Sequence, residues 1–140
     1  MGEFSWDKIP ISQLATENPV AGAEYADITV PTGKRWKVVG VLVNLVTDAT
    51  VSNRTPQMYF KDATHTQAMV QASNPSVIAA STNGWRSWVT GSLQTTPTGY
   101  GNHIAPIELP AGAYISFTTA NLQVGDNYGV GRIWYKEAPA

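Results

Sequence analysis

Two histidines, His65 and His103, are the side chains of this sequence with the widest catalytic and metal-binding repertoire. His65 lies between two predicted strands, and His103 follows a glycine-rich segment. Neither belongs to an HxH, HExxH or EF-hand motif, and a metal site needs several ligands that converge in space. We therefore expect both imidazoles to lie in solvated loops, and we predict no metal site and no cofactor.

Nucleophilic and acid–base chemistry have equally little support. The chain contains no cysteine and lacks the GxSxG motif that positions a catalytic serine. The stretch "GDNYGVG" (residues 125–131) is not followed by the Lys-Ser/Thr pair of a phosphate-binding loop, so it more simply forms a turn. The later carboxylates, Glu108, Asp126 and Glu137, show no catalytic spacing. We predict no catalytic residues and no enzyme; the hydrolase alternative requires a pocket that joins a histidine to a carboxylate.

The tryptophans give a second kind of candidate site. Trp85 and Trp88 lie three residues apart on one predicted strand, so their side chains point to opposite faces of the sheet. One of them can enter the core while the other faces outward with Arg86. An exposed tryptophan can stack on a sugar ring or anchor a protein interface, although core or edge packing is at least as consistent with the pattern. We take Trp88 as the candidate exposed aromatic contact.

Apolar side chains without an evident core partner begin the sequence. The stretch "GEFSWDKIPISQL" (residues 2–14) shows period-2 spacing, and Pro10 and Pro19 disfavour helix at the residues before them. We predict that residues 1–22 form an extended arm with at most a short turn. Its candidate interface residues are Phe4, Trp6, Ile9, Ile11 and Leu14. Two placements are open: the arm packs on a neighbouring subunit, which we favour, or it folds back on its own sheets.

The composition argues against several classes of protein. Hydrophobic residues make up 43% of the 140 residues and charged residues 14%, against about 25% charged residues in an average soluble protein. The formal net charge of −1 gives no basic footprint for nucleic acid. Neither a signal peptide nor an apolar run of about 18 residues is readable. We therefore predict no nucleic-acid or membrane partner. The low share of charged residues is consistent with a surface that is substantially covered in the working state, and equally with a β-rich protein that carries many threonines on its strand faces.

From residue 23 onward the sequence alternates between strand and turn signals. The longest strand signal is "RWKVVGVLVNLVT" (residues 35–47). It is apolar on both faces, so we predict a central strand between the core and a second covering, with Gly40 as a bulge or bend. Residues 57–62 and 67–72 are predicted to form one hairpin, and Asn83-Gly84 is predicted to be the turn of another.

The remaining signals complete an all-β chain. Residues 103–109 are expected to form an edge strand because they contain Pro106, and a loop is expected between Thr90 and His103. "VPTGKRW" and "LPAGAYI" share one frame, which predicts equivalent corners. The pattern gives eight or nine strands and no convincing amphipathic helix. We predict an extended N-terminal arm (residues 1–22) and a β-sandwich domain (residues 23–140) that is jelly-roll-like.

The stretch "VPTGKRWKVVGVLVNLVTDATVSNRTPQMYF" (residues 30–60) resembles small β-sandwich structural proteins of tailed-phage virions. The shared elements are a Pro-x-Gly corner, a Trp-led long strand and "ATVSNR" (residues 49–54). The later "LPAG" and "NLQVGDNY" are consistent with this resemblance. The shared residues shape turns, so no functional residue transfers. With its small size and apolar arm, the chain looks most like a capsid decoration, or cement, protein.

The resemblance implies a non-enzymatic virion protein that reinforces the outer capsid surface after assembly in the host cytoplasm. It implies a homo-oligomer, with a trimer favoured, and the major capsid protein as partner. The alternative is a carbohydrate- or receptor-binding module of a phage tail, with a glycan as its ligand.

Overall fold

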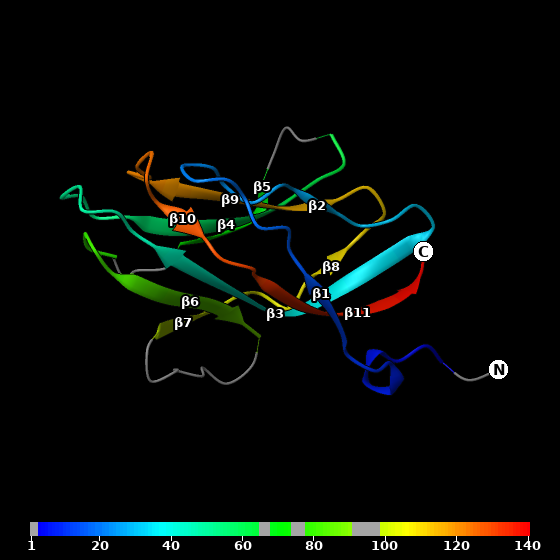
Figure 1. Ribbon diagram of the computed structural model, residues 1–140. Helices are drawn as coiled ribbons and strands as arrows, with labels where there is room; N and C mark the ends of the chain where they lie inside the picture. The colour runs from blue at the N-terminus through cyan, green and yellow to red at the C-terminus, as the bar shows by residue number, and fades with distance from the viewer. Residues whose placement is uncertain (1–2, 65–67, 74–77, 91–98) are drawn as a thin grey trace.

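In the computed structural model the chain folds into two β-sheets that pack face to face (Figure 1). The structure describes residues 3–64, 68–73, 78–90 and 99–140. The larger sheet has the strand order β1-β11-β3-β6-β7, with β8 and β10 also paired to β3, and the smaller sheet has the order β2-β9-β4-β5. The predicted all-β fold is confirmed.

The elements are η1 (Trp6–Lys8), β1 (Ser12–Ala15), β2 (Ile28–Thr29), β3 (Lys34–Val46), β4 (Thr55–Lys61), β5 (Ala68–Ser73), β6 (Asn83–Val89), β7 (Gly99–His103), β8 (Glu108–Leu109), β9 (Tyr114–Ala120), β10 (Asn127–Tyr128) and β11 (Arg132–Pro139). Among the described residues, no helix is long and apolar enough to cross a membrane.

The core lies between the two sheets. In β4 every second residue is buried, so one face of the smaller sheet contributes Met58 and Phe60 to the interior. Side chains from the facing sheet, such as Leu45 and Ile133, are fully buried against them in one cluster. This alternation is the period-2 pattern that a half-buried strand requires.

A β-bulge in β3 explains why the longest strand signal is apolar on both faces. Between Trp134 and Tyr135 of β11, the partner in β3 moves from Gly40 to Val38, so Val39 is an extra residue. One extra residue reverses which side chains of the strand face the core. The core face of β3 therefore consists of Trp36, Val38, Val41, Val43 and Leu45. The predicted bulge is confirmed, and most of the apolar side chains that the pattern divided between two faces lie on one.

The two Pro-x-Gly turns meet at one corner of the sandwich. The N–H of Lys34 or Ala113 donates to the carbonyl of the proline three residues earlier, at 3.1 Å in both turns. Gly33 and Gly112 have φ angles of 75° and 83°, which glycine adopts at little cost. Val30 joins the turns, because its N–H donates to the Ala113 carbonyl at 2.8 Å. The predicted equivalence of these corners is confirmed.

Asn83 and Gly84 do not form a hairpin turn, so that prediction is wrong. Both residues lie in β6, where Gly84 is opposite Leu45 of β3. A Cβ added to Gly84 would lie 2.9 Å from Cδ1 of Ile78, so the close approach of a buried side chain favours glycine here. The chain turns earlier, at Ser81, whose φ is 52°.

The second half of the chain differs in part from expectation. The hairpin predicted for residues 57–62 and 67–72 is present as the antiparallel pairing of β4 with β5, from Gln57 opposite Ser73 to Lys61 opposite Ala68; residues 65–67 lie outside the described residues. Part of the predicted loop before His103 is instead strand β7, which runs parallel to β6. The predicted edge strand at residues 103–109 is interrupted, because β7 ends at His103 and β8 begins only at Glu108.

The predicted arm contains a strand of the larger sheet. β1 pairs antiparallel with β11, with Ser12 opposite Tyr135 and Ala15 opposite Arg132. The N–H of Thr16 extends the pairing by donating to the Gly131 carbonyl at 3.0 Å. In this chain the arm therefore folds back on its own sheet, which is the second of the two placements that the sequence left open.

Candidate interaction surface

One turn of 3-10 helix fixes the start of the arm. Ser5 has an extended backbone, and its Oγ accepts a hydrogen bond from the N–H of Asp7 at 3.3 Å, which caps η1. The N–H of Ile9 donates to the carbonyl of Trp6 at 3.1 Å. Pro10 follows and has no N–H to continue the turn. The chain therefore leaves η1 in an extended conformation and enters β1.

Trp6 attaches this turn to the larger sheet. Its Nε1–H donates to the Oε1 atom of Glu108 in β8, and its carbonyl accepts a hydrogen bond from Nζ of Lys136 in β11 at 2.8 Å. Lys37 of β3 is opposite both Glu108 and Lys136 in the sheet. The two partners of Trp6 therefore flank one position on the same sheet.

Arg35 lies at the centre of the same surface. The guanidinium carbon is 4.4 Å from the centroid of the Phe4 ring and 5.4 Å from that of Trp6, within the range of cation–π attraction. Its Nη1 donates to Oε2 of Glu108 at 3.3 Å, and its Nε donates to the carbonyl of Pro139 at 3.1 Å. We call the following residues the arm cluster: Phe4, Trp6, Arg35, Glu108 and Lys136.

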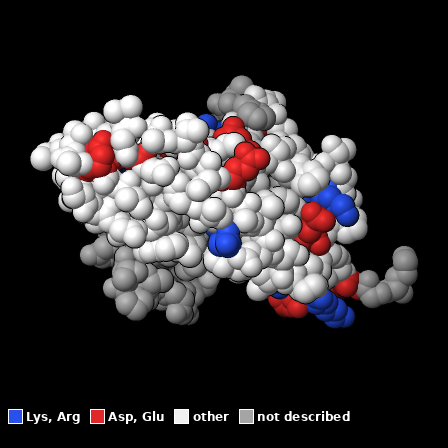
Figure 2. Space-filling view, viewed as in Figure 1, with Lys and Arg blue, Asp and Glu red and all other residues white. Residues whose placement is uncertain are grey.

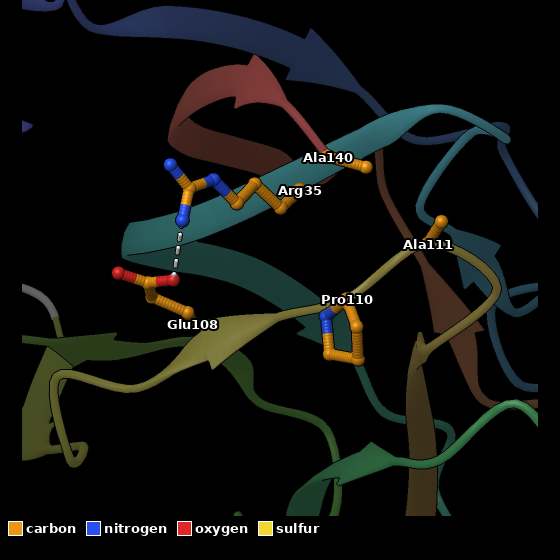
Figure 3. Close-up of a pocket in the computed structure, with 5 residues that line it drawn as sticks. All are labelled: Arg35, Glu108, Pro110, Ala111 and Ala140. Carbon is orange, nitrogen blue, oxygen red and sulfur yellow. Dashed lines mark hydrogen bonds and ion pairs between the residues drawn. The ribbon is translucent and has the colours of Figure 1, made fainter. Parts of the chain in front are cut away.

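Two shallow pockets adjoin the arm cluster. Figure 3 shows the first, of about 280 Å³, in which Arg35 and Glu108 face each other beside Pro110, Ala111 and Ala140. The second, of about 240 Å³, is lined by residues that include Trp6, Ile11, Lys37, Val39 and Lys136. Both are smaller than the roughly 300–1,000 Å³ of typical small-molecule sites. Charged groups around small apolar recesses are better suited to contact with another protein.

The arm covers its own apolar side chains unequally. Leu14 packs against the core, and Trp6 and Ile9 are half-buried. Phe4 and Ile11 remain 50% and 54% exposed. The five predicted interface residues therefore divide into three that the arm buries in part on its own sheet and two that stay available for another molecule.

Trp88 is not an exposed aromatic contact, so that prediction is wrong. Its relative exposure is 0%, and it lies opposite Val41 in the core. Gly84, Arg86 and Trp88 share the buried face of β6, while Trp85 is half-buried on the other face. The prediction that Trp85 and Trp88 lie on opposite faces of the strand is confirmed. The choice of the exposed one is wrong, because it depends on which face of β6 meets the smaller sheet.

The histidines have no shared site in the described residues. His103 is exposed at the end of β7, where its backbone N–H donates to Oδ1 of Asn102 at 2.9 Å. His65 lies outside the described residues. Among the residues that the structure describes, no group of three or more His, Cys, Asp or Glu side chains could hold a metal ion.

A buried ion cluster, which sequence reasoning missed, joins two loops at the end of the sandwich. Arg54 and Asp126 have 0% exposed side chains, and they form two hydrogen bonds, Nε to Oδ2 at 2.8 Å and Nη2 to Oδ1 at 2.9 Å. Nη2 also donates to Oδ1 of Asp48 at 2.8 Å. We call these three residues the buried ion cluster. The signal was present: Arg54 ends "ATVSNR" and Asp126 lies in "NLQVGDNY", the two loop stretches of the resemblance.

Backbone groups satisfy the rest of the buried ion cluster. Nη1 of Arg54 donates to the carbonyls of Thr50 and Ser52, at 2.9 and 2.7 Å. Asp126 accepts hydrogen bonds from the N–H groups of Asp48 and Gln123, at 2.9 and 2.8 Å. Burial by itself would raise the pKa of Asp126, but the hydrogen bonds from Arg54 and these N–H groups outweigh it and lower that pKa. The cluster therefore holds ionised groups in the interior.

Comparisons with known proteins add no family assignment. No family model matches the chain, and no curated protein sequence matches it.

Proposed function

We propose that this protein is a non-enzymatic structural subunit of a tailed-phage virion, namely a capsid decoration protein. One observation carries the proposal: Phe4 and Ile11 are 50% and 54% exposed although the arm is ordered on its own sheet. Apolar side chains that are held in place beside charged groups are suited to a stable protein partner. The resemblance of residues 30–60 to virion β-sandwich proteins indicates which class of partner this is.

The ordered arm gives association a favourable energy. Fully burying an apolar side chain contributes roughly 1.5–3 kcal/mol, and about half of that remains to be gained at Phe4 and Ile11. A disordered arm would lose much of this gain to conformational entropy. Here η1 and β1 already order the arm, so association requires less ordering.

The partner proposed for this surface is the major capsid protein on the outside of the head, with the subunit as a homo-oligomer and most simply a trimer. An identical β1–β11 pairing is available between neighbouring copies, because every copy carries the same strand and the same edge. The arm can therefore pair within one chain or between chains through the same register.

The test compares binding to decoration-free capsids of the phage that encodes the protein. The double variant Phe4→Ser/Ile11→Ser should bind at least about tenfold more weakly, because a partly polar surface replaces the apolar one. Its free energy of unfolding should stay within about 0.5 kcal/mol of wild type. Co-sedimentation and urea unfolding measure the two quantities. Val130→Ser is the matched control, because Val130 is 41% exposed outside the arm.

A truncation that removes residues 1–11 provides a second arm variant. It ends before β1, so the sheet and the contact of Leu14 with the core are kept. Undiminished capsid binding by both arm variants would reject the role of the arm, and failure of the wild type to bind capsids would reject the proposed function.

A further inference from the structure

Three loops at one end of the sandwich each present a valine to solvent. Val20, Val51 and Val124 are 77%, 93% and 87% exposed. In Figure 1 the loops before β2, between β3 and β4 and between β9 and β10 lie at the end of the molecule opposite η1. We call Val20, Val51 and Val124 the valine surface. Single exposed valines are ordinary, but these three lie on loops that are bonded to one another.

Direct contacts join the loops of Val20 and Val124. The N–H of Gly22 donates to the carbonyl of Asp126 at 2.7 Å. A Cβ added to Gly22, whose φ is 77°, would lie 3.0 Å from the carbonyl oxygen of Val124. The two loops therefore touch along their backbones.

The buried ion cluster connects the loop of Val51 to the loop of Val124. Arg54 donates to the carbonyls on both sides of Val51, those of Thr50 and Ser52, and also to Asp126. At the surface, Nδ2 of Asn121 donates to the carbonyl of Asn53 at 3.0 Å. All three valines are therefore presented by a preorganised support, which lowers the entropic cost of docking.

The charge around the valine surface limits the kind of partner. Residues 18–24, 47–54 and 121–127 contain three acidic residues, Glu24, Asp48 and Asp126, and one basic residue, Arg54, so their formal net charge is −2. Arg54 is 0% exposed and paired with Asp126 and Asp48, and the side chain of Asp48 is 23% exposed. Figure 2 shows acidic atoms among uncharged ones at this end of the molecule. An anionic membrane or a nucleic acid would be repelled. Charge complementarity favours a protein surface with apolar recesses and a basic rim.

We infer that the valine surface is a second docking surface, for a protein with apolar recesses inside a basic rim. It lies at the opposite end of the sandwich from the arm cluster, so one subunit can contact two neighbours at once. The inference rests on the proposed function in that the capsid shell supplies this partner.

The test uses the double variant Val51→Asp/Val124→Asp and decoration-free capsids as the probe. The new carboxylates would have to be dehydrated in the recesses, so binding should weaken at least about tenfold, with unchanged urea unfolding. Val130→Asp is the matched control and should bind like wild type. Raising the salt concentration should also weaken the binding of the wild type to capsids, because the contacts at the rim are electrostatic.

Each result decides the matter. Wild-type capsid binding that survives both valine substitutions overturns the inference and leaves the proposed function standing. If the wild type does not bind capsids, the proposed function falls and the inference falls with it. If light scattering shows a smaller oligomer for the double variant, the valine surface binds a second copy of this chain. If the wild type floats with phosphatidylcholine vesicles, the valine surface binds a membrane. Either outcome also overturns the inference.

Discussion

Arg54 and Arg35 each pair with carboxylates, but in opposite surroundings. Arg54 and Asp126 are both 0% exposed, whereas the side chains of Arg35 and Glu108 are 32% and 47% exposed. Arg54 is held by five hydrogen bonds to side chains and loop carbonyls. Arg35 makes two and lies over two aromatic rings of the arm.

The difference separates a cluster that stabilises the fold from one that stays at the surface. A buried ion pair is costly to desolvate, and removal of one partner leaves an uncompensated charge in the interior. A half-exposed pair stays partly hydrated and contributes little to global stability. We therefore interpret the buried ion cluster as the support of the loop end, and the arm cluster as a contact that can open locally.

The largest effect is expected from Arg54→Met. The substitution leaves Asp126 buried without its cation, so the free energy of unfolding should fall by about 3–5 kcal/mol in urea denaturation. The matched control is Lys34→Met, which removes a surface pair with Glu137 at 3.7 Å and should cost at most about 1 kcal/mol. The double variant Arg54→Met/Asp126→Asn should recover part of the loss, since the uncompensated charge is gone while the amide oxygen can still accept a backbone hydrogen bond. Equal effects of the two single variants would contradict the comparison.

A smaller change in the free energy of unfolding is expected when the pH is lowered. The folded-state pKa of Asp126 is lowered, so its contribution to stability is present above the unfolded pKa of about 3.9 and is lost as the pH falls through the folded value. Glu24 acts with the opposite sign, because burial raises its pKa against its hydrogen bonds with Thr119; its contribution is lost as the pH rises through the folded value.

Comparison with Asp126→Asn separates these two carboxylates, because Glu24 is present in both proteins. The difference in urea midpoint between wild type and variant should shrink as the pH falls below about 4. A difference that stays constant from pH 6 to pH 3 would show that the ionised Asp126 does not stabilise the fold.

The smallest effect on global stability is expected from Arg35→Ala. The substitution removes the contacts of the guanidinium with Phe4, Trp6 and Glu108. The free energy of unfolding should nevertheless change by less than about 1 kcal/mol, because the pair of Arg35 with Glu108 is half-exposed. The change should be local: amide hydrogen exchange in β1 should accelerate while that in β3 stays the same. Lys61→Ala, which removes another surface cation stacked over an aromatic ring at 5.2 Å, should leave β1 exchange unchanged. Loss of protection throughout the larger sheet would instead make Arg35 a global stabiliser.

Short-range pattern predicted much of the fold. Alternating side chains gave the all-β class and the long strand at residues 35–47. The Pro-x-Gly corners were found because a left-handed turn position favours glycine wherever it occurs. The same local reasoning failed at Gly84, since a glycine is also selected where a buried side chain comes close, and Ile78 is not visible as its neighbour in the sequence.

What depends on partners far along the chain was decided only by tertiary structure. The sequence by itself determined that β6 alternates and that the first residues are apolar and extended. Only the packed sheets placed Trp88 inside, paired Arg54 with Asp126, and set β1 against β11 so that Phe4 and Ile11 remain exposed. The physical reason is that a period of two shows only that successive side chains point to opposite faces of the sheet. Which of the two faces is buried depends on the surface that packs against the strand.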